Sequence, residues 1–378
     1  MEFAKANVST LNVRRRPLGQ PTQHLSGSTP KCKLDIGFAN GVETRENFRY
    51  DWSQILVPGE LKSNPNADKR TDTWLDLARY SRHVFTAQDT RRFVLGFTLC
   101  GSIMRLWEFD RLGGIASSPF DINKEGLQFV SAVLGYLWMN EEQLGFDPTI
   151  LESDGKRYVD IMRNDKTERL VIVELMKRHS SVAGRATTCW KAYCDGDESK
   201  RILIIKDSWQ YPERGEEGEL LRDATEKGVI NMARYYHHKT VRIGGKDDDI
   251  NSNVRKGLGI TKATDAFLHT SATRKTEDTM PPPSPSRGRS RSTARKRSSS
   301  SLNAPLPPNK RSCSTSPHAD KGRSEPPNRI HRRVILRDYG KNIYKASSRV
   351  AMLAALEGNI TGMRRSGDYY TQTNCSRT

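Results

Sequence analysis

Apolar residues follow helical and strand spacings between residues 41 and 153. Steps of three and four residues predict one helix from Trp74 to Phe85 and a second from Phe129 to Leu137. Shorter apolar runs, which predict strands, occur at Ile55–Leu61, Phe93–Cys100, Ile103–Phe109 and Ile115–Phe120. The second and third of these runs are expected to pair as a hairpin that turns at Gly101. The mixture predicts a small α/β leading domain.

A second folded unit is predicted over residues 154–270. Its strand-like runs are Tyr158–Ile161, Leu170–Met176, Cys189–Tyr193 and Arg201–Lys206. A charged helix from Glu216 to Lys227 follows them, and another strand is expected at Val241. This order predicts a small sheet with one packed helix.

Two segments lack such periodicity. Residues 1–40 contain three spaced prolines and are predicted to be a disordered tail. Residues 271–328 are rich in serine, proline and arginine and are predicted to be a disordered basic insertion, because such composition buries little apolar surface. Periodic sequence resumes over residues 329–362, with a strand at Arg332–Tyr339 and a helix at Ser347–Gly358. Residues 363–378 are expected to form an irregular tail.

The composition narrows the classes of protein that fit. The 378 residues carry a net charge of +18, which favours an acidic partner. The longest nearly apolar run, Phe93–Met104, is too short to span a bilayer, and Met1–Arg16 holds no secretory signal. We therefore expect an intracellular protein, cytoplasmic or nuclear, with no membrane contact. The six cysteines show neither a C-x-x-C pair nor zinc-finger spacing, so a zinc site or a disulfide framework is not expected.

The sharpest local feature is the apolar strand Ile202–Lys206, which ends in a lysine. A lysine in this position holds the α and β phosphates of a bound nucleotide in kinases, and a glutamate on the next helix orients it. The candidate glutamates are Glu216, Glu217 and Glu219. Glu219 is favoured because it lies nine residues before Gly228, a spacing that resembles the helix and following loop of kinases. The alternative is that Lys206 is simply a solvated strand end.

Longer stretches resemble the fungal-type protein kinase family. The resemblance covers about residues 45–360. The segments that carry it are Trp52–Lys62, Arg91–Arg111, Ala183–Tyr193, Lys206–Tyr211, Glu217–Leu221, Tyr235–His238, Arg337–Gly340 and Ser347–Gly358. It implies an α+β fold, in which a protein kinase-like N-terminal lobe, an antiparallel sheet plus one helix, follows the α/β domain and precedes a partial helical lobe.

The resemblance also implies site residues and a reaction. Gly184, Arg185, Thr187 and Thr188 would cover the phosphates of ATP, Lys206 would anchor them, and Glu219 would be its ion-pair partner. Val334–Gly340 would form the hinge strand and linker beside the adenine. In a complete kinase, Mg²⁺ would assist transfer of the γ-phosphate of ATP to serine or threonine hydroxyls of proteins.

The sequence departs from this pattern downstream. A kinase needs an H-R-D aspartate, an asparagine five residues later and a D-F-G aspartate, and neither motif occurs in the chain. His331-Arg332-Arg333 and Asp338-Tyr339-Gly340 look like degraded versions, but too few residues separate them. We therefore expect a chain truncated before its catalytic half, that is, an inactive pseudokinase or a fragment. No catalytic or metal-binding residues of the kinase type are expected in it. Its expected activity is limited to nucleotide binding.

The leading domain suggests a different class of function. Asp51, followed by Glu60-Leu61-Lys62, resembles the D…E-x-K arrangement of the restriction-endonuclease-like fold. Two carboxylates there would hold a metal ion, and the lysine would activate or stabilise water. Active members of that fold commonly carry glutamine on the following helix, where this chain has Asp76. The alternatives are a metal-dependent nuclease, an inactive scaffold, or Glu60 and Lys62 on one exposed strand face.

The basic insertion supplies a third hypothesis. Between residues 281 and 333 there are 13 lysines and arginines and 2 acidic residues. Arginines interleave with serines from Arg287 to Ser299, a pattern that binds phosphate backbones without reading sequence or serves as a nuclear import signal. The alternative to a kinase is a binding or scaffold protein that contacts nucleic acid or acidic partners through this insertion. The insertion itself is alternatively a solvated linker with no binding role.

Overall fold

The computed structural model describes residues 15–19, 24–27, 32–40, 49–256, 258, 260, 327–339, 347–354 and 356–358. Several predictions fall outside this part of the chain. They concern most of the basic insertion at 271–328, the irregular tail at 363–378, and Gly340 at the end of the predicted hinge.

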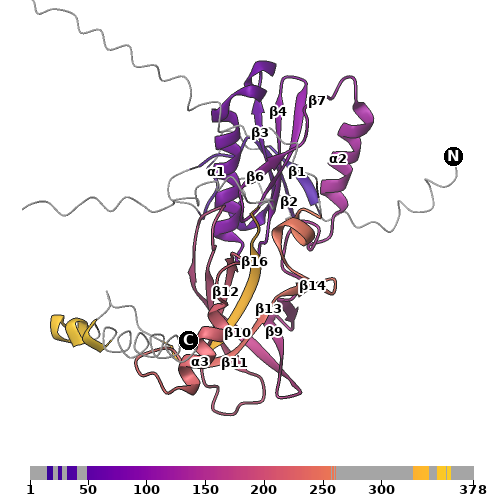
Figure 1. Cartoon of the computed structure of the whole chain (residues 1–378). Coiled ribbons are helices and arrows are strands. Elements are labelled where there is room, and N and C mark those ends of the chain that lie inside the picture. The colour runs from indigo at the N-terminus through magenta and orange to yellow at the C-terminus, as the bar shows by residue number, and fades with distance from the viewer. Residues whose placement is uncertain are drawn as a thin grey trace, which may run out of the picture. The chain divides into compact units, whose positions relative to one another are not determined.

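The leading domain is built on a seven-stranded sheet within the described residues. The strand order is β1-β2-β3-β4-β5-β6, with β7 also paired to β5 (Figure 1). The strands are β1 (Arg15–Leu18), β2 (Ile36–Asn40), β3 (Ile55–Lys62), β4 (Val94–Cys100), β5 (Ile103–Phe109), β6 (Gly114–Ala116) and β7 (Phe120–Asp121). The β3–β4 pair is parallel and the other pairs are antiparallel.

Two helices cover the two faces of this sheet (Figure 1). Helix α1 (Thr71–Ala87) connects the parallel strands β3 and β4, and its Leu77 and Val84 pack on Ile55. Helix α2 (Gly126–Trp138) covers the other face, where Tyr136 packs on Phe97. Short 3-10 turns at Trp52–Gln54 and Pro65–Lys69 flank β3. Both predicted helices and the hairpin at Gly101 are confirmed.

The prediction of a disordered tail over residues 1–40 is wrong for two of its segments. Strands β1 and β2 extend the leading sheet beyond β3. Leu18, Phe38 and Ala39 are buried there, which supplies the apolar contacts that order the segments. Pro17 is compatible with β1 because this strand lies at the sheet edge, where a missing N–H breaks no ladder.

The second sheet is antiparallel throughout, with the order β13-β16-β12-β11-β10-β9-β8. Its strands are β8 (Leu151–Ser153), β9 (Lys156–Arg163), β10 (Lys166–Arg178), β11 (Thr188–Cys194), β12 (Leu203–Gln210), β13 (Tyr235–Thr240) and β16 (Ile330–Leu336). Helix α3 (Glu217–Glu226) packs against β13 and β16. The predicted sheet with one packed helix is therefore confirmed.

The strand expected at Val241 is displaced by a few residues. Val241 lies between β13 and the two-stranded ribbon of β14 (Arg242–Ile243) and β15 (Lys246–Asp247). A π-helical turn follows at Ile250–Val254.

Strand β16 occupies an inner position of the second sheet although it is the last of the described strands in sequence (Figure 1). It pairs with β12 on one side and β13 on the other. Ile335 and Ile205 meet across the β12–β16 pair and pack on Trp190 in the core of this sheet. The sheet thus depends on a strand that arrives from a distant part of the chain.

The described chain is a mixed α+β structure with antiparallel sheets and few helices, in agreement with the predicted fold class. Residues 349–354 and 356–358 are helical, as expected for Ser347–Gly358. None of the helices among the described residues has the length and apolar character needed to cross a membrane.

Candidate functional site

Lys206 lies within β12, paired across the sheet with Cys189 of β11 and Val334 of β16. Its ammonium group donates a hydrogen bond to the carboxylate of Glu217, in the first turn of α3. The Lys206 and Glu217 side chains are 23% and 26% exposed. The pair is therefore shielded by the fold but remains accessible to a ligand from solvent.

The turn between β10 and β11 lies beside this pair. Gly184 has φ +123°, a conformation that side-chain-bearing residues rarely adopt. The following residue, Arg185, donates a hydrogen bond from its guanidinium to the second carboxylate oxygen of Glu217 at 2.9 Å. Glu217 thus joins the turn to Lys206, and two cations, Arg185 and Lys206, share one carboxylate.

The leading domain holds this turn in place. The Gly184 N–H donates to the carbonyl oxygen of Arg111 at 2.9 Å, and the Arg111 guanidinium donates back to the carbonyls of Ser181 and Val182, each at 3.2 Å. Ala186 is buried against Trp209 in a small apolar cluster. The conformation of the turn is therefore determined by both domains.

The two threonines of the turn differ in position. Thr188 is 5% exposed, and its hydroxyl donates to the carbonyl of Ala186 at 3.4 Å. Thr187 is half-buried, and its carbonyl accepts from the N–H of His179 at 3.0 Å. Of the predicted phosphate-covering residues, the structure brings Gly184 and Arg185 next to Lys206 and leaves the Thr188 hydroxyl in the interior.

The prediction that Glu219 pairs with Lys206 is wrong, because Glu217 takes that position. Side chains two residues apart on a helix differ by about 200° in direction, so only one of these glutamates faces β12. Glu219 instead binds Arg222 and the Nε2 atom of His238, the latter at 3.0 Å. A Cβ atom at Gly218 would lie 2.3 Å from the His238 ring, so this glycine lets α3 approach β13 closely.

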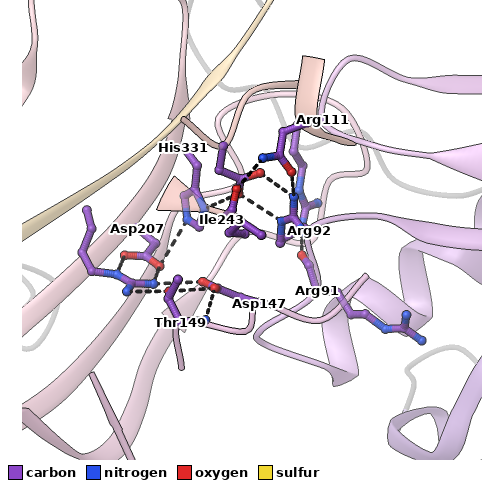
Figure 2. Close-up of polar contacts among 11 residues, drawn as sticks. Arg91, Arg92, Arg111, Asp147, Thr149, Asp207, Ile243 and His331 are labelled. Carbon is purple, nitrogen blue, oxygen red and sulfur yellow. Dashed lines mark hydrogen bonds and ion pairs between the residues drawn. The ribbon is translucent and has the colours of Figure 1, made fainter. Parts of the chain in front are cut away.

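A buried ion network lies on the opposite face of β12 from Lys206, since successive strand residues alternate in direction. Arg333 of β16 forms two hydrogen bonds with the Asp207 carboxylate, at 2.8 and 2.7 Å, and a third with Asp147 at 3.0 Å. His331 of β16 lies 3.3 Å from Asp207 through Nε2 (Figure 2). The network joins the second sheet to the segment that follows α2.

The network continues into the leading domain through Asp248. The His331 Nδ1 atom lies 3.0 Å from the Asp248 carboxylate, and Arg92 donates two hydrogen bonds to the same carboxylate, at 3.0 and 2.5 Å (Figure 2). The Trp209 ring stacks on His331, with the ring centroids 4.8 Å apart. Each of these side chains is at most 8% exposed.

The charges of the network perturb the pKa values of its members. Burial lowers the pKa of His331, but the hydrogen bonds that its ring donates to the Asp207 and Asp248 carboxylates, together with their charges, outweigh burial and raise the pKa to about 9. Burial raises the pKa of Asp207, but Arg333 and His331 outweigh it and hold the value well below the ordinary range. At neutral pH, His331 is therefore a cation between two carboxylates.

One side-chain atom from each of Asp147, Asp207 and His331 lies within 4.8 Å of the others, a grouping that resembles a metal site. Arg333 already bridges both carboxylates, and a protonated His331 has no lone pair to offer a metal ion. Three cations, Arg92, His331 and Arg333, face three anions, Asp147, Asp207 and Asp248. A cavity of about 20 Å³ beside them has room for about one water molecule. The arrangement is a neutral ion network and not a metal centre.

The segments that look like kinase motifs have other roles. His331-Arg332-Arg333 lies in strand β16, which agrees with its rejection as a catalytic loop. The Asp338 carboxylate forms an ion pair with the Arg234 side chain and accepts a hydrogen bond from the backbone N–H of Arg234 at 2.7 Å. The predicted hinge from Val334 thus begins in β16 and leaves the sheet beside Arg234.

Sequence reasoning missed this network. His331 and Arg333 lie on one face of β16, but Arg332 between them is also charged, so the segment shows no alternation that would distinguish a buried charged face from an exposed one.

Asp51 does not join the E-x-K segment. Its carboxylate caps the 3-10 turn at Trp52–Gln54 and accepts a hydrogen bond from Ser26 at 3.0 Å. Glu60 and Lys62 do form an ion pair, and Asp76 of α1 lies 3.5 Å from Lys62. Glu60 is 1% exposed, so the alternative that it lies on an exposed strand face is wrong.

Comparison with known proteins gives one match. A sequence-family model described as fungal protein kinase matches residues 33–366. None of the curated proteins and none of the solved structures matches the chain. The matched range includes both sheets except for β1, and it includes the cluster of Gly184, Arg185, Lys206 and Glu217.

Proposed function

The chain belongs to the fungal protein kinase family, and on this premise we propose that it binds the phosphates of ATP through Lys206, Glu217 and the turn at Gly184–Thr188. The observation that carries the proposal is the ion pair between Lys206 and Glu217. Kinases require a lysine on an inner strand, paired with a glutamate on the neighbouring helix, to hold the α and β phosphates.

Arg185 strengthens the case for an anionic ligand. Its side chain is 51% exposed and shares Glu217 with Lys206. One carboxylate therefore faces two cations, and a phosphate group would balance the second positive charge. The Gly184 N–H is held by the Arg111 carbonyl, so the support from this turn comes from the position of the Arg185 guanidinium beside Glu217.

We assign the adenine to the segment that leaves β16. Val334 lies directly across the sheet from Lys206, and Leu336 ends the strand. A base beside this segment would hydrogen-bond backbone groups, so the identity of the side chains matters little there. Lys206 and the hinge would then hold the two ends of the nucleotide.

The proposal stops at binding. Kinases hold Mg²⁺ with a D-F-G aspartate and a catalytic-loop asparagine, and they position the substrate hydroxyl with the H-R-D aspartate. The sequence contains neither motif, so its residues do not fit the catalytic metal ions of a kinase. When bound in a complete kinase, Mg²⁺ neutralises charge on the transferred phosphate. We propose that this chain binds nucleotide and does not by itself transfer phosphate to protein hydroxyls.

The test is the binding of a fluorescent ATP analogue to the full chain, together with the shift in melting temperature that ATP causes. ATP at a hundred times its dissociation constant should stabilise the wild-type protein by about 2.7 kcal/mol. Lys206→Met should abolish binding, and Glu217→Gln should weaken it about tenfold, because a hydrogen bond to a charged group is lost.

Glu219→Gln is the matched control, since Glu219 is on the same helix but binds Arg222 and His238. It should bind the analogue like the wild type. Absence of binding to a folded wild-type chain, or equal binding by a folded Lys206→Met variant, would overturn the proposal.

A further inference from the structure

The turn between β10 and β11, residues 179–187, is attached to two different parts of the molecule. Arg82 of α1 donates hydrogen bonds to the carbonyl of Ser180 at 3.0 Å and to the Ser180 hydroxyl at 3.3 Å. Further along the turn, the Arg185 carbonyl accepts a hydrogen bond from the N–H of Trp209 in β12 at 2.8 Å. The first half of the turn is thus held by the leading domain and the second half by the second sheet.

Arg111, just after β5, forms the central contacts of the first half. Its guanidinium donates to the carbonyls of Ser181 and Val182, and its own carbonyl accepts a hydrogen bond from the Gly184 N–H. The residue is 3% exposed, and the central carbon of its guanidinium lies 3.8 Å from the centre of the Phe85 ring of α1. Hydrogen bonds are electrostatically stronger in such a buried position than in water, so they restrain the turn firmly.

The burial of this arginine has a cost that its contacts with the turn explain. Burial, followed by the charge of Arg178, lowers the pKa of the Arg111 guanidinium well below its ordinary value. A cation is therefore kept in an unfavourable environment, where its side chain forms hydrogen bonds with backbone carbonyls of the turn and with the carbonyl of Arg91, the latter at 2.8 Å.

The restrained half of the turn ends at the residue that contacts the nucleotide site. Gly184 has φ +123°, and Arg185, which follows it, donates to the Glu217 carboxylate at 2.9 Å. Because the Arg185 side chain is 51% exposed, its position depends mainly on the backbone that carries it. That backbone is fixed by the Arg111 carbonyl on one side and by Trp209 on the other.

We propose that Arg82 and Arg111 are positioning residues of the nucleotide site, which hold the turn so that Arg185 reaches the nucleotide phosphates next to Lys206. This inference rests on the proposed function, since it concerns the same site. Neither positioning residue contacts the ligand. Holding a binding group in place before the ligand arrives raises affinity, because less ordering entropy is lost on binding. The leading domain thereby controls the affinity of the second domain for phosphates.

The inference distinguishes the phosphates of the ligand from its base. The adenine is assigned to the segment that leaves β16, and Arg82 and Arg111 hold only the turn. Loss of either arginine should therefore weaken the binding of ATP and leave that of adenosine, which has no phosphates. A purely structural role would instead weaken both ligands alike, because the whole site would be disturbed.

The test compares the dissociation constants of ATP and adenosine for the full chain, measured by competition with the fluorescent ATP analogue. In the wild type, both compounds should displace the analogue. Arg111→Met should weaken ATP binding by about tenfold and adenosine binding by less than about twofold. Arg82→Met should weaken ATP binding by about threefold and also leave adenosine binding unchanged.

Each variant has a matched control in the leading domain. Arg105 is on β5 and donates to the Ser117 carbonyl at 3.0 Å and to Asp68, and none of its contacts among the described residues reaches the turn. Arg105→Met should therefore lose stability and keep the wild-type affinity for ATP. Arg79→Met is the control for Arg82→Met, because Arg79 lies one turn earlier on α1 and binds Asp76.

The outcomes separate this inference from the proposed function. If ATP does not displace the analogue from the wild type, the nucleotide site and its positioning residues both fall. If the wild type binds ATP, then unchanged ATP binding in the two variants, or an equal weakening of ATP and adenosine, overturns the positioning roles alone. Arg82 is exposed, so Arg82→Met decides the question if Arg111→Met fails to fold.

Discussion

Two groups of charged side chains in this protein both combine carboxylates with cations, and they differ in burial and in charge balance. In the ion network, Asp147, Asp207 and Asp248 face Arg92, His331 and Arg333, and each carboxylate has a cationic partner. In the β3 acidic cluster of Asp35, Glu60 and Asp76, Lys62 is shared between Glu60 and Asp76, and Glu60 also forms a side-chain hydrogen bond with Tyr80.

The difference shows why proximity of ligand atoms is a poor guide to a metal site. The ion network has the tighter grouping of carboxylates and histidine, yet its own cations already neutralise it. The acidic cluster is looser, with three carboxylates beside two cations, Lys62 and Arg79. Charge balance and burial, and not spacing alone, therefore distinguish a group of charges that stabilises the fold from one that contributes little.

The largest expected effect is that of Arg333→Met. The substitution leaves Asp207 and Asp147 buried without their common partner, and such a loss costs about 3–5 kcal/mol. The free energy of unfolding, measured with urea, should fall by this amount. Arg332→Met is the control, because Arg332 is on the other face of β16 and its side chain is 20% exposed. A small effect of Arg333→Met, equal to that of Arg332→Met, would contradict the proposed role of the network.

The second largest effect expected is a loss of stability at high pH, caused by deprotonation of His331. Its pKa is about 9 in the folded protein and 6.5 in the reference state, so the folded state binds the proton more tightly. The stabilisation is complete below pH 6.5 and is lost as the pH rises through about 9, a change of about 3 kcal/mol. Urea unfolding at pH 6, 7.5 and 9 should show this decline. If His331→Gln retains the same decline, another group is responsible.

The smallest expected effect has the opposite sign. Glu60→Gln removes a buried charge whose raised pKa makes its ionised form unfavourable in the folded state at neutral pH. The variant should be unchanged or more stable by about 1 kcal/mol. Urea unfolding measures this directly. A loss as large as that expected for Arg333→Met would show that the acidic cluster is balanced after all.

Periodicity was sufficient to predict the parts of the fold with strong apolar patterns. Helices α1 and α2 and the β4–β5 hairpin follow directly from it. Strands β1 and β2 did not, because a four-residue edge strand that contains Pro17 and a five-residue strand that contains Gly37 carry little pattern. They are ordered by the pairing of β2 with β3 and of β1 with β2, which the local sequence does not encode.

The site was predictable in kind and less so in detail. Lys206 and the neighbouring helix could be identified, but Glu219 was favoured over Glu217 because sequence alone does not fix the rotation of α3 to one residue. The ion network was out of reach for a different reason. Arg333 and Asp147 are 186 residues apart, and charged residues on a strand normally indicate solvent exposure.

The inner position of β16 affects how this protein folds. During synthesis, β12 and β13 emerge well before Ile330, and at roughly 5–20 residues per second the ribosome needs several more seconds to deliver β16. Until then both strands have unpaired edges, which are prone to aggregate. Asp147 and Asp207 also lack Arg333, their common partner, over this interval. We therefore expect docking of β16 to be the slow step of refolding. The entropy cost of closing so long a loop is incurred before the stabilising contacts of β16 form.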